Sequence, residues 1–323
     1  MSSNQEILNR LRNSSETFTI DDKTYAGEAA GMFIRKAITG ADTIDSGSCY
    51  VKDGIKKKYT IPRIAGDYES IIQDYAPTPT PKGGLTVSKQ VLEPVIYEVY
   101  DEFNPQIWKD HWQAINLKPE LLDRTLPFEV QSALVQQYAE FHAKYFNKLL
   151  WNGDTTTTGV YKYFDGWVKQ IADSADSIKV SAPTTLTTSN IFAEMLKGYQ
   201  AIPEALRYDP EMKFFVSYGT FDLFVQAQID QTYKGVDITS EGVAYFKGRR
   251  VVRIADFPAD TYIIARGSAN MRSNLWVGMN STADDTTIKL AMLQANSDYM
   301  FIKMLMAADV TVGWFEETVY YGA

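Results

Sequence analysis

The stretch LLWNGDTTTTGVYKYFDGWVKQI, residues 149–171, determines how the rest of the sequence is divided. A helical pattern of apolar residues ends at Asn152-Gly153, four threonines follow, and Phe164-Asp165-Gly166-Trp167 restarts the apolar pattern. An Asn-Gly pair after a helix predicts a left-handed C-cap at Gly153. The stretch therefore predicts a long helix, a loose threonine bridge, and an aromatic return of the chain onto a sheet.

The residues before this stretch predict one helix from Pro127 to Trp151. Thr125 suits the N-cap, and Pro127 suits the first turn, where a missing N–H costs nothing. At about 1.5 Å per residue the helix would be roughly 37 Å long, well above the usual length. Apolar residues at steps of three and four predict the face that packs on a sheet. We expect that face to hold Phe128, Leu134, Tyr138, Phe141, Tyr145, Leu149 and Trp151.

Further upstream, two runs rich in Val, Ile and Tyr, 48–64 and 85–103, predict the arms of a long β-hairpin. The connection between them, AGDYESIIQDYAPTPTPKGG, has three prolines and paired glycines, which exclude a core strand. A long hairpin cannot bury both of its faces on its own. The connection is therefore either a disordered surface loop or a tip that lies on a neighbouring subunit.

Lys56, Lys57 and Lys58 fall on the first predicted strand of this hairpin. Three consecutive cations on a strand cannot all point to one side. They either protect an exposed strand edge or meet acidic groups of another chain. The second possibility favours the hairpin that lies on a neighbour.

The composition excludes several classes of protein. The 323 residues are 45% hydrophobic and 22% charged, which is ordinary for a folded soluble protein. The net charge of −8 argues against a nucleic-acid-binding surface, which needs a basic patch. No apolar run approaches the ~20 residues of a membrane span, and the polar segment Met1–Arg12 is no signal peptide. Cys49 is the only cysteine, so no intramolecular disulfide forms.

The chemistry-bearing residues are few. Two histidines and one cysteine cannot make a histidine-cysteine metal cage. His111 is interpreted as structural, and His142 as a histidine on the helix surface or at an interface. Asp284-Asp285 lacks the spacing of a calcium loop and reads as a solvated turn. No phosphate-binding loop, nucleophile elbow or dinucleotide fingerprint is present. We expect no cofactor, no metal and no catalysis, although an enzyme with a carboxylate site remains an alternative.

The second half of the chain mixes helices and strands without regular βαβ units, which predicts an α+β protein rather than a doubly wound fold. The expected elements are a helix within 187–207, a strand at 213–217 followed by a helix, two strands around Lys247-Gly248, and strands that end at Tyr321.

This order of elements resembles the major capsid proteins of tailed bacteriophages, which have the Hong Kong 97-type shell fold. The resemblance spans nearly the whole chain. It is carried by the order of the elements and by several short segments: Asn152-Gly153 with Phe164-Asp165-Gly166, FFVSYGTFDLF at 214–224, Gly248 with Val251 and Pro258, and the closing run 298–321.

The resemblance implies a division of the chain. It predicts an N-terminal arm at 1–45, an extended hairpin (E-loop) with flanking strands at 46–104, a peripheral domain with a spine helix at 105–185, an axial domain at 186–295, and return strands of the peripheral domain at 296–323.

The resemblance also implies a function and partners. Copies of the chain would form hexamers and pentamers that tile an icosahedral shell around packaged double-stranded DNA. The shell would be assembled in the host cytoplasm and located in the virion. The family's shell interior tends to repel DNA, which agrees with the net charge of −8. Because the length is close to the family's core, a separate scaffolding protein is expected beside a portal. No sequence-specific nucleic-acid binding and no membrane contact are expected.

Six residues of the hairpin region are the expected inter-subunit contacts: Lys56, Lys57, Lys58, Tyr68, Tyr75 and Lys82. Some relatives crosslink a hairpin lysine to an asparagine of a neighbour, but no motif selects such a pair here, and ordinary ion pairing is favoured. An encapsulin-type cellular shell is the alternative with the same fold. The long, proline-tipped hairpin favours the phage capsid.

Overall fold

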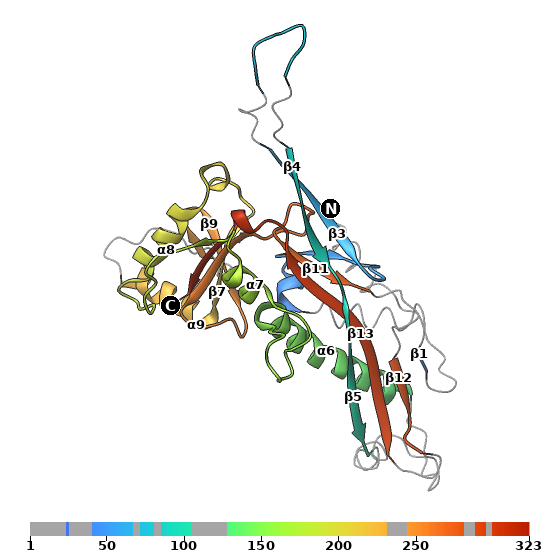
Figure 1. Ribbon diagram of the computed structural model, residues 1–323. Helices are drawn as coiled ribbons and strands as arrows, with labels where there is room; N and C mark the ends of the chain where they lie inside the picture. The colour runs from blue at the N-terminus through green and yellow to red at the C-terminus, as the bar shows by residue number, and fades with distance from the viewer. Residues whose placement is uncertain are drawn as a thin grey trace.

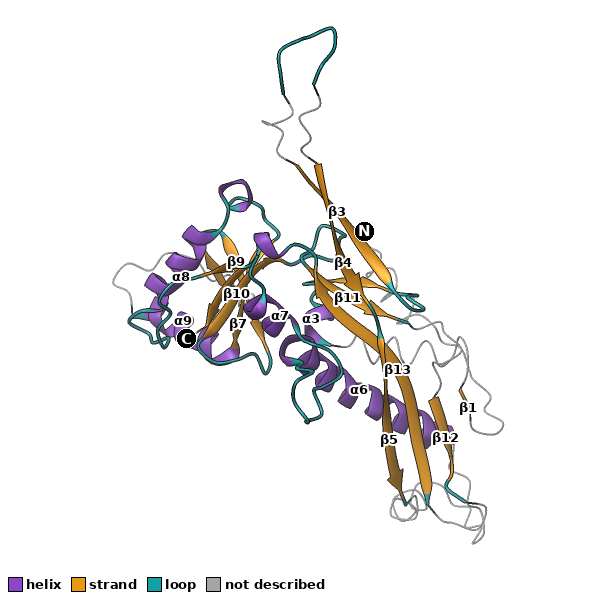
Figure 2. Cartoon of the chain, viewed as in Figure 1, coloured by secondary structure: helices purple, strands orange, loops and turns teal. Residues whose placement is uncertain are grey.

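A computed structural model describes residues 24–25, 41–66, 72–80, 85–104, 128–230, 244–280, 288–294 and 299–322. Within these residues, two six-stranded sheets and one long helix form the body, and a two-stranded hairpin projects from it (Figure 1). Figure 2 shows the two sheets at opposite ends of the body, with the C-terminal end of the long helix between them. The α+β class predicted from the sequence is confirmed.

The first sheet is built around one long strand, β13, which pairs antiparallel with β5, β12 and β11. Alternate residues of β13 from Met300 to Val310 are buried, and the residues between them are partly exposed. One face of this sheet therefore packs on the core, where the long helix α6 lies. The strands are β1 (Thr24–Tyr25), β2 (Tyr50–Lys52), β5 (Val95–Phe103), β11 (Leu275–Met279), β12 (Ile288–Met292) and β13 (Met300–Val312), and the helix is α6 (Phe128–Asn152).

The second sheet is buried on both faces. Phe214 and Val216 of its strand β7 face α8 and α9, whereas Phe215 faces the core shared with α6. The central strands β7 and β10 are accordingly buried along nearly their whole length, without the alternation of a half-exposed strand. The elements are β6 (Ile178–Lys179), β14 (Val319–Gly322), β10 (Thr261–Arg266), β7 (Met212–Ser217), β9 (Arg249–Ile254) and β8 (Ala244–Phe246), in that spatial order, with α8 (Ile191–Ala201) and α9 (Tyr218–Ile229).

Several local predictions for this half are confirmed. Strand β7 leads directly into α9, and Ser217 caps that helix by accepting a hydrogen bond from the Thr220 N–H at 3.0 Å. Lys247 and Gly248, with φ of 49° and 76°, form the two-residue turn between β8 and β9. Short helical segments complete this part of the chain: α3 (Asp42–Asp45), η1 (Glu204–Leu206) and η2 (Phe315–Glu317).

Sheet membership crosses two of the boundaries predicted for the domains. Strands β11 and β12 lie within 186–295, yet they pair with β13 in the first sheet. Strand β14 lies within 296–323, yet it pairs with β10 and β6 in the second sheet. The chain therefore passes from one sheet to the other more often than a division into consecutive segments implies.

The helix α6 ends in a contact between two glycines. The Gly166 N–H donates to the Gly153 carbonyl at 2.8 Å, which closes the loop 154–165 at its base. A Cβ on Gly166 would lie 2.6 Å from both Gly153 N and Trp151 O, and one on Gly153 would lie 2.3 Å from Phe164 O. Gly153 has no positive φ, so the predicted left-handed C-cap is wrong. Glycine is required here because two backbone segments approach closely, and not because the chain adopts a left-handed conformation.

The threonine segment is fixed by a lysine and two aspartates, so the prediction of a loose bridge is also wrong. Lys169 Nζ lies 2.5 Å from Asp154 Oδ1 and 2.8 Å from Asp165 Oδ1. The same oxygens accept hydrogen bonds from the backbone and hydroxyl groups of Thr156 and Thr155, respectively. The Lys169 hydrogen bond lowers the pKa of Asp154 to about 2. The threonines themselves remain exposed.

The aromatic return beyond this loop is confirmed. Phe164 and Trp167 are 3% and 0% exposed, and Trp167 Nε1 donates to the Thr311 carbonyl of β13 at 3.3 Å. Helix α7 (Trp167–Asp173) begins here. Trp151, fully buried at the end of α6, packs against Trp167, Phe215 and Phe257, with ring centroids about 5 Å apart. This aromatic group joins α6, α7 and the second sheet in one core.

The prediction of a single long helix is confirmed for Phe128–Asn152, but its buried face was only partly predicted. Leu134 is 9% exposed, as expected, whereas Phe141 is 55% exposed and does not face the sheet. His142 was expected at the helix surface or at an interface. It is 3% exposed, so it does not lie at the surface, and its Nε2 lies 2.9 Å from the Tyr97 hydroxyl of β5. The predicted cap residue Thr125 and first-turn residue Pro127 lie outside the described residues.

Two phenylalanines on this helix test the corrected face. Phe146 is 0% exposed and packs on Phe164, so Phe146→Ala is expected to lower the free energy of unfolding by about 3–5 kcal/mol. Phe141→Ala, the matched control on the exposed side, is expected to lower it by about 0.5 kcal/mol or less. Urea unfolding followed by circular dichroism measures both. Equal losses for the two variants would contradict the phase of the helix.

Candidate functional site

The most distinctive feature of the surface is the projecting hairpin, formed by β3 (Tyr59–Gly66) and β4 (Leu85–Leu92) (Figure 1). The two strands pair with each other, from Tyr59 opposite Leu92 to Gly66 opposite Leu85, and with no other strand among the described residues. A two-stranded ribbon is at best marginally stable alone. Its base must therefore be held by the body of the subunit, and its outer part is available to another surface.

The predicted long hairpin is shorter than expected because its arms divide. Strand β2 at the start of the first arm pairs with β11, and β5 at the end of the second arm pairs with β13. Only the last part of the first arm and the first part of the second arm form the hairpin. The break in the second arm occurs at Glu93-Pro94, between β4 and β5. Proline cannot donate to a strand ladder, so it marks the point where the chain leaves one sheet for another.

A small apolar cluster holds the base of the hairpin. Trp276 of β11 packs with Ile55, Ile61 and Leu92, and all four are at most 4% exposed. The Trp276 ring has its centroid 4.6 Å from that of Tyr50 and 6.4 Å from that of Tyr59. This cluster is separate from the two main cores. The hairpin is thus attached through a few contacts, and these contacts set its direction.

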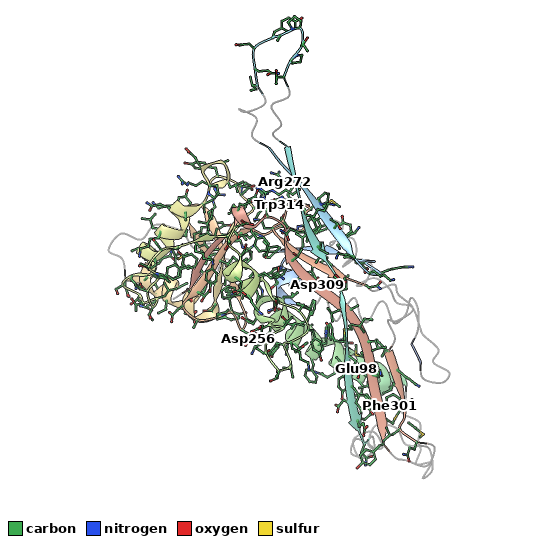
Figure 3. All side chains as sticks on the ribbon, viewed as in Figure 1. Glu98, Asp256, Arg272, Phe301, Asp309 and Trp314 are labelled. Carbon is green, nitrogen blue, oxygen red and sulfur yellow. The ribbon has the colours of Figure 1, made fainter. Side chains whose placement is uncertain are left out.

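A partly buried carboxylate lies at the same junction. Asp309 of β13 accepts hydrogen bonds from the backbone N–H groups of Glu93 at 2.7 Å and of Val310 at 2.8 Å. The pKa of Asp309 is raised to about 6, mainly by burial and to a smaller extent by the charges of Glu93 and Asp165, while the two N–H bonds lower it in part. Figure 3 shows Asp309 on β13, in the middle of the molecule. The ionised carboxylate therefore holds the link between β4 and β5 at some cost in desolvation.

This carboxylate should make stability depend on pH. Its pKa is higher in the folded chain than in the unfolded chain, so its contribution favours the folded state at low pH and is lost as the pH rises through about 6. Asp309→Asn removes the titration. From pH 4 to pH 7, wild type is expected to lose up to about 3 kcal/mol of unfolding free energy relative to the variant. Urea unfolding at a series of pH values measures this, and parallel profiles would contradict it.

The structure places the predicted contact residues at the two ends of the hairpin. Lys56, Lys57 and Lys58 are exposed, but they lie in the loop between β2 and β3 and not on a strand, so that part of the prediction is wrong. Lys58 Nζ lies 3.5 Å from Glu93 Oε2 of its own chain, in an exposed pair. Tyr75, in the tip, is 94% exposed. Tyr68 and Lys82 lie outside the described residues.

Two residues important at the base were not singled out from the sequence. Trp276 gives no local signal, because a tryptophan within a short apolar strand is equally expected in either of the main cores. Asp309 interrupts the apolar run MFIKMLMAADVTV, and a lone acid within a buried strand was a usable signal.

Other kinds of site receive no support from the described residues. No three His, Cys, Asp or Glu side chains among them are grouped to hold a metal ion. None of the described helices is long and apolar enough to cross a membrane. Cys49 is buried, which raises the pKa of its thiol to about 12. His111 and Asp284-Asp285 lie outside the described residues.

No family model and no curated protein matches the sequence, but solved structures match the fold. One is described as "Satellite phage P4 procapsid including size determination (Sid) protein": TM-score 0.61, 14% identity, covering 100% of this chain and 98% of that chain. Another is "The capsid of Myoviridae Phage XM1": TM-score 0.52, 14% identity, 96% of each chain. A third is "Crystal structure of virus-like particle from Pyrococcus furiosus": TM-score 0.50, 11% identity, 90% of this chain and 99% of that chain. The chain therefore has the Hong Kong 97-type fold of shell-forming capsid proteins, as the order of its sequence elements implied.

Proposed function

We propose that the protein is the major capsid protein of a tailed bacteriophage, a structural subunit that assembles with copies of itself into an icosahedral shell. The observation that carries this proposal is the likeness to a phage procapsid chain over the full length of both chains. A fold that matches from end to end leaves no large part of the described chain for another activity.

The proposal extends to the assembly, the location and the division of the chain. The subunits form hexamers and pentamers around packaged double-stranded DNA, in the virion, after assembly in the host cytoplasm. Residues 1–45 act as the arm, 46–104 as the E-loop region, 105–185 as the peripheral domain with α6 as its spine, 186–295 as the axial domain and 296–323 as return strands. Strands β11 and β12 nevertheless join the sheet of β13, and β14 joins the sheet of β10. A scaffolding protein and a portal are the expected further partners.

The projecting hairpin is the part of the subunit best suited to contact a neighbour. It extends from the body on a narrow base, and all the described residues of its tip, 72–80, are exposed. Large apolar side chains such as Tyr75 and Ile72 are 94% and 70% exposed there. Exposed apolar groups on a projecting segment are typical of surfaces that become covered on association.

Electron microscopy of the purified protein tests the proposal. Closed shells, or rings of five and six subunits, are the expected result. A population of monomers under all conditions of salt and concentration, with and without co-expressed neighbouring genes, would contradict it. An encapsulin-type cellular shell is not favoured, because the phage procapsid chain matches over nearly the whole length of both chains. Particles filled with a cellular enzyme and free of DNA would support that alternative.

A further inference from the structure

The charges along the hairpin and the following strand are strongly segregated. Residues 55–66 and 85–92 include five cationic side chains and no acidic one: Lys56, Lys57, Lys58, Arg63 and Lys89. Residues 93–104 include four acidic side chains and no cationic one: Glu93, Glu98, Asp101 and Glu102. In a chain with a net charge of −8, such a basic run is unusual. The base of the hairpin is positively charged, and strand β5 is negatively charged. One continuous segment of the chain therefore carries two surfaces of opposite charge.

Strand β5 presents its acidic residues on an open surface. Among the described residues it pairs only with β13, so its other edge carries no strand. One side of β5 packs on α6, where the Tyr138 hydroxyl donates to Asp101 at 2.5 Å. On the other side lie Glu98 and Glu102, with Ile96 and Tyr100, which are 57% and 49% exposed. Apolar centres surrounded by charge are typical of interfaces between proteins.

The acidic residues are only lightly neutralised by their own chain. Lys303 Nζ lies 2.7 Å from Glu98, in a pair in which both side chains are largely exposed. Such exposed pairs stabilise a protein by about 1 kcal/mol or less and exchange partners readily. Glu102 accepts a hydrogen bond from the neutral Tyr100 hydroxyl at 2.5 Å, and no ion pair of Glu102 is found within the described part of the chain. Figure 3 shows Glu98 near the middle of β5, away from the hairpin.

The lysines cannot reach most of these acids within one subunit. Lys58 meets Glu93 of its own chain at 3.5 Å. At about 3.4 Å per residue, Glu98 and Glu102 lie roughly 17 Å and 30 Å farther along the strand. The hairpin also points in the opposite direction from β5 (Figure 1). Only another copy of the chain can bring a basic hairpin base against this part of β5.

We propose that the acidic, exposed side of β5, marked by Glu98 and Glu102, is the docking surface for the Lys56–Lys58 loop of a second copy of the chain. This inference rests on the proposed function, because it names the partner surfaces within the shell. The contact joins two different patches, so it is heterologous. Heterologous contacts that close by rotation form rings, as hexamers and pentamers require.

Charge reversal on each side tests the docking surface. Glu98→Lys/Glu102→Lys, and separately Lys56→Glu/Lys57→Glu/Lys58→Glu, are each expected to raise the protein concentration needed for assembly by about tenfold or more, because like charges then face each other. Circular dichroism should be unchanged, since the altered groups are exposed. Glu102→Lys alone is the milder variant, because it leaves the Glu98–Lys303 pair in place. Asp176→Lys/Glu204→Lys, at exposed acids far along the chain, is the control for net charge.

Recombining the variants gives the decisive result. A chain with both sets of reversals has the charges exchanged at every contact, and its assembly is expected to return to within a few-fold of wild type. An equal mixture of the two single-sided variants can satisfy every contact only when they alternate. Alternation is possible in a ring of six and impossible in a ring of five. The mixture is therefore expected to form hexamers and no pentamers.

The failures of the two proposals can be told apart. If wild type assembles and the Glu98→Lys/Glu102→Lys variant assembles equally well at low and high salt, the docking surface is wrong while the shell function stands. If the chain with both sets of reversals assembles no better than the chains with one set, the proposed pairing of the Lys56–Lys58 loop with β5 is likewise wrong. If wild type forms no shells or rings, the shell function is wrong. Sedimentation of the same variants at low salt then decides the pairing, and equal self-association for all of them overturns it.

Discussion

Deleting residues 66–83 is expected to leave a folded, soluble subunit that forms no shells. The described residues of the tip are exposed and belong to none of the cores. After the deletion, Gly84-Leu85 connects Ala65 to Thr86, two residues that are paired across the hairpin. A two-residue link with glycine first suits a type II′ turn, so the shortened hairpin can close without strain. The Trp276 cluster at its base is untouched.

The effect on assembly should be complete because the proposed contact with a neighbour is lost in every subunit. Circular dichroism and thermal unfolding should match wild type, whereas electron microscopy and sedimentation should show only single subunits or small oligomers. Tyr75→Ala is the matched point variant, since this side chain is 94% exposed in the isolated subunit. Its stability should be unchanged, and any loss of assembly would identify an anchor. Normal shells from the deletion variant would show that the tip is dispensable.

The long helix shows how far its sequence pattern could be followed. Its extent was predictable, because the apolar periodicity runs uninterrupted to Asn152. Its phase was not, because aromatic residues lie on both sides of α6. The buried stripe includes Ala139 and His142, a small and a polar residue, while Phe141 is exposed. A prediction based on the spacing of large apolar residues therefore misses a buried face that contains alanine and histidine.

The hairpin shows a signal that was present but not used. Residues 85–103 read as one strand, because Val, Ile and Tyr continue through the segment. Glu93-Pro94 lies in the middle of that run, and a proline argues against an unbroken central strand. The exchange of partners there, from β3 to β13, depends on contacts with residues more than 200 positions away, which no local pattern contains. The same holds for the Asp309 bond to Glu93.

The pattern around Asn152-Gly153 was correctly seen as the end of the helix, but for the wrong physical reason. A left-handed C-cap tolerates asparagine and places no demand on a residue thirteen positions later. The observed contact demands glycine at both Gly153 and Gly166, because the two backbones touch. The second glycine was visible in the sequence, in Phe164-Asp165-Gly166-Trp167. Its partner could be found only from the fold.

Gly166→Ala is accordingly expected to be among the most damaging single substitutions in the chain. The backbone of Gly166, with φ of −70° and ψ of 166°, is one that alanine adopts readily. On backbone grounds alone, alanine would stabilise the protein by about 0.4–1 kcal/mol through the unfolded state. The new methyl group, however, would lie 2.6 Å from Gly153 N and from Trp151 O. These are backbone atoms at the end of α6, so they cannot rotate away as a flexible side chain could.

Relief of this clash would move the end of α6 away from the start of α7. That movement would stretch the bond from Gly166 to Gly153 and disturb the packing of Trp151 on Trp167. Overpacking in a core lowers the free energy of unfolding by about 1–3 kcal/mol and occasionally more. We expect a loss at the upper end of this range, because the atoms that the methyl group meets belong to the backbone. A loss of about 3 kcal/mol or more in the free energy of unfolding is therefore expected from urea unfolding.

Gly159→Ala is the matched control for this effect, because the residue belongs to the same loop and undergoes the same substitution. A Cβ there would come no closer than 4.0 Å to any other group, and its φ is not positive. Alanine at 159 is expected to be neutral or to stabilise by up to about 1 kcal/mol, again through the unfolded state. Equal effects at 159 and 166 would mean that the loss reflects chain flexibility in the loop. A loss confined to 166 would show that contact between two backbones fixes where the helix ends and the chain turns back to the sheet.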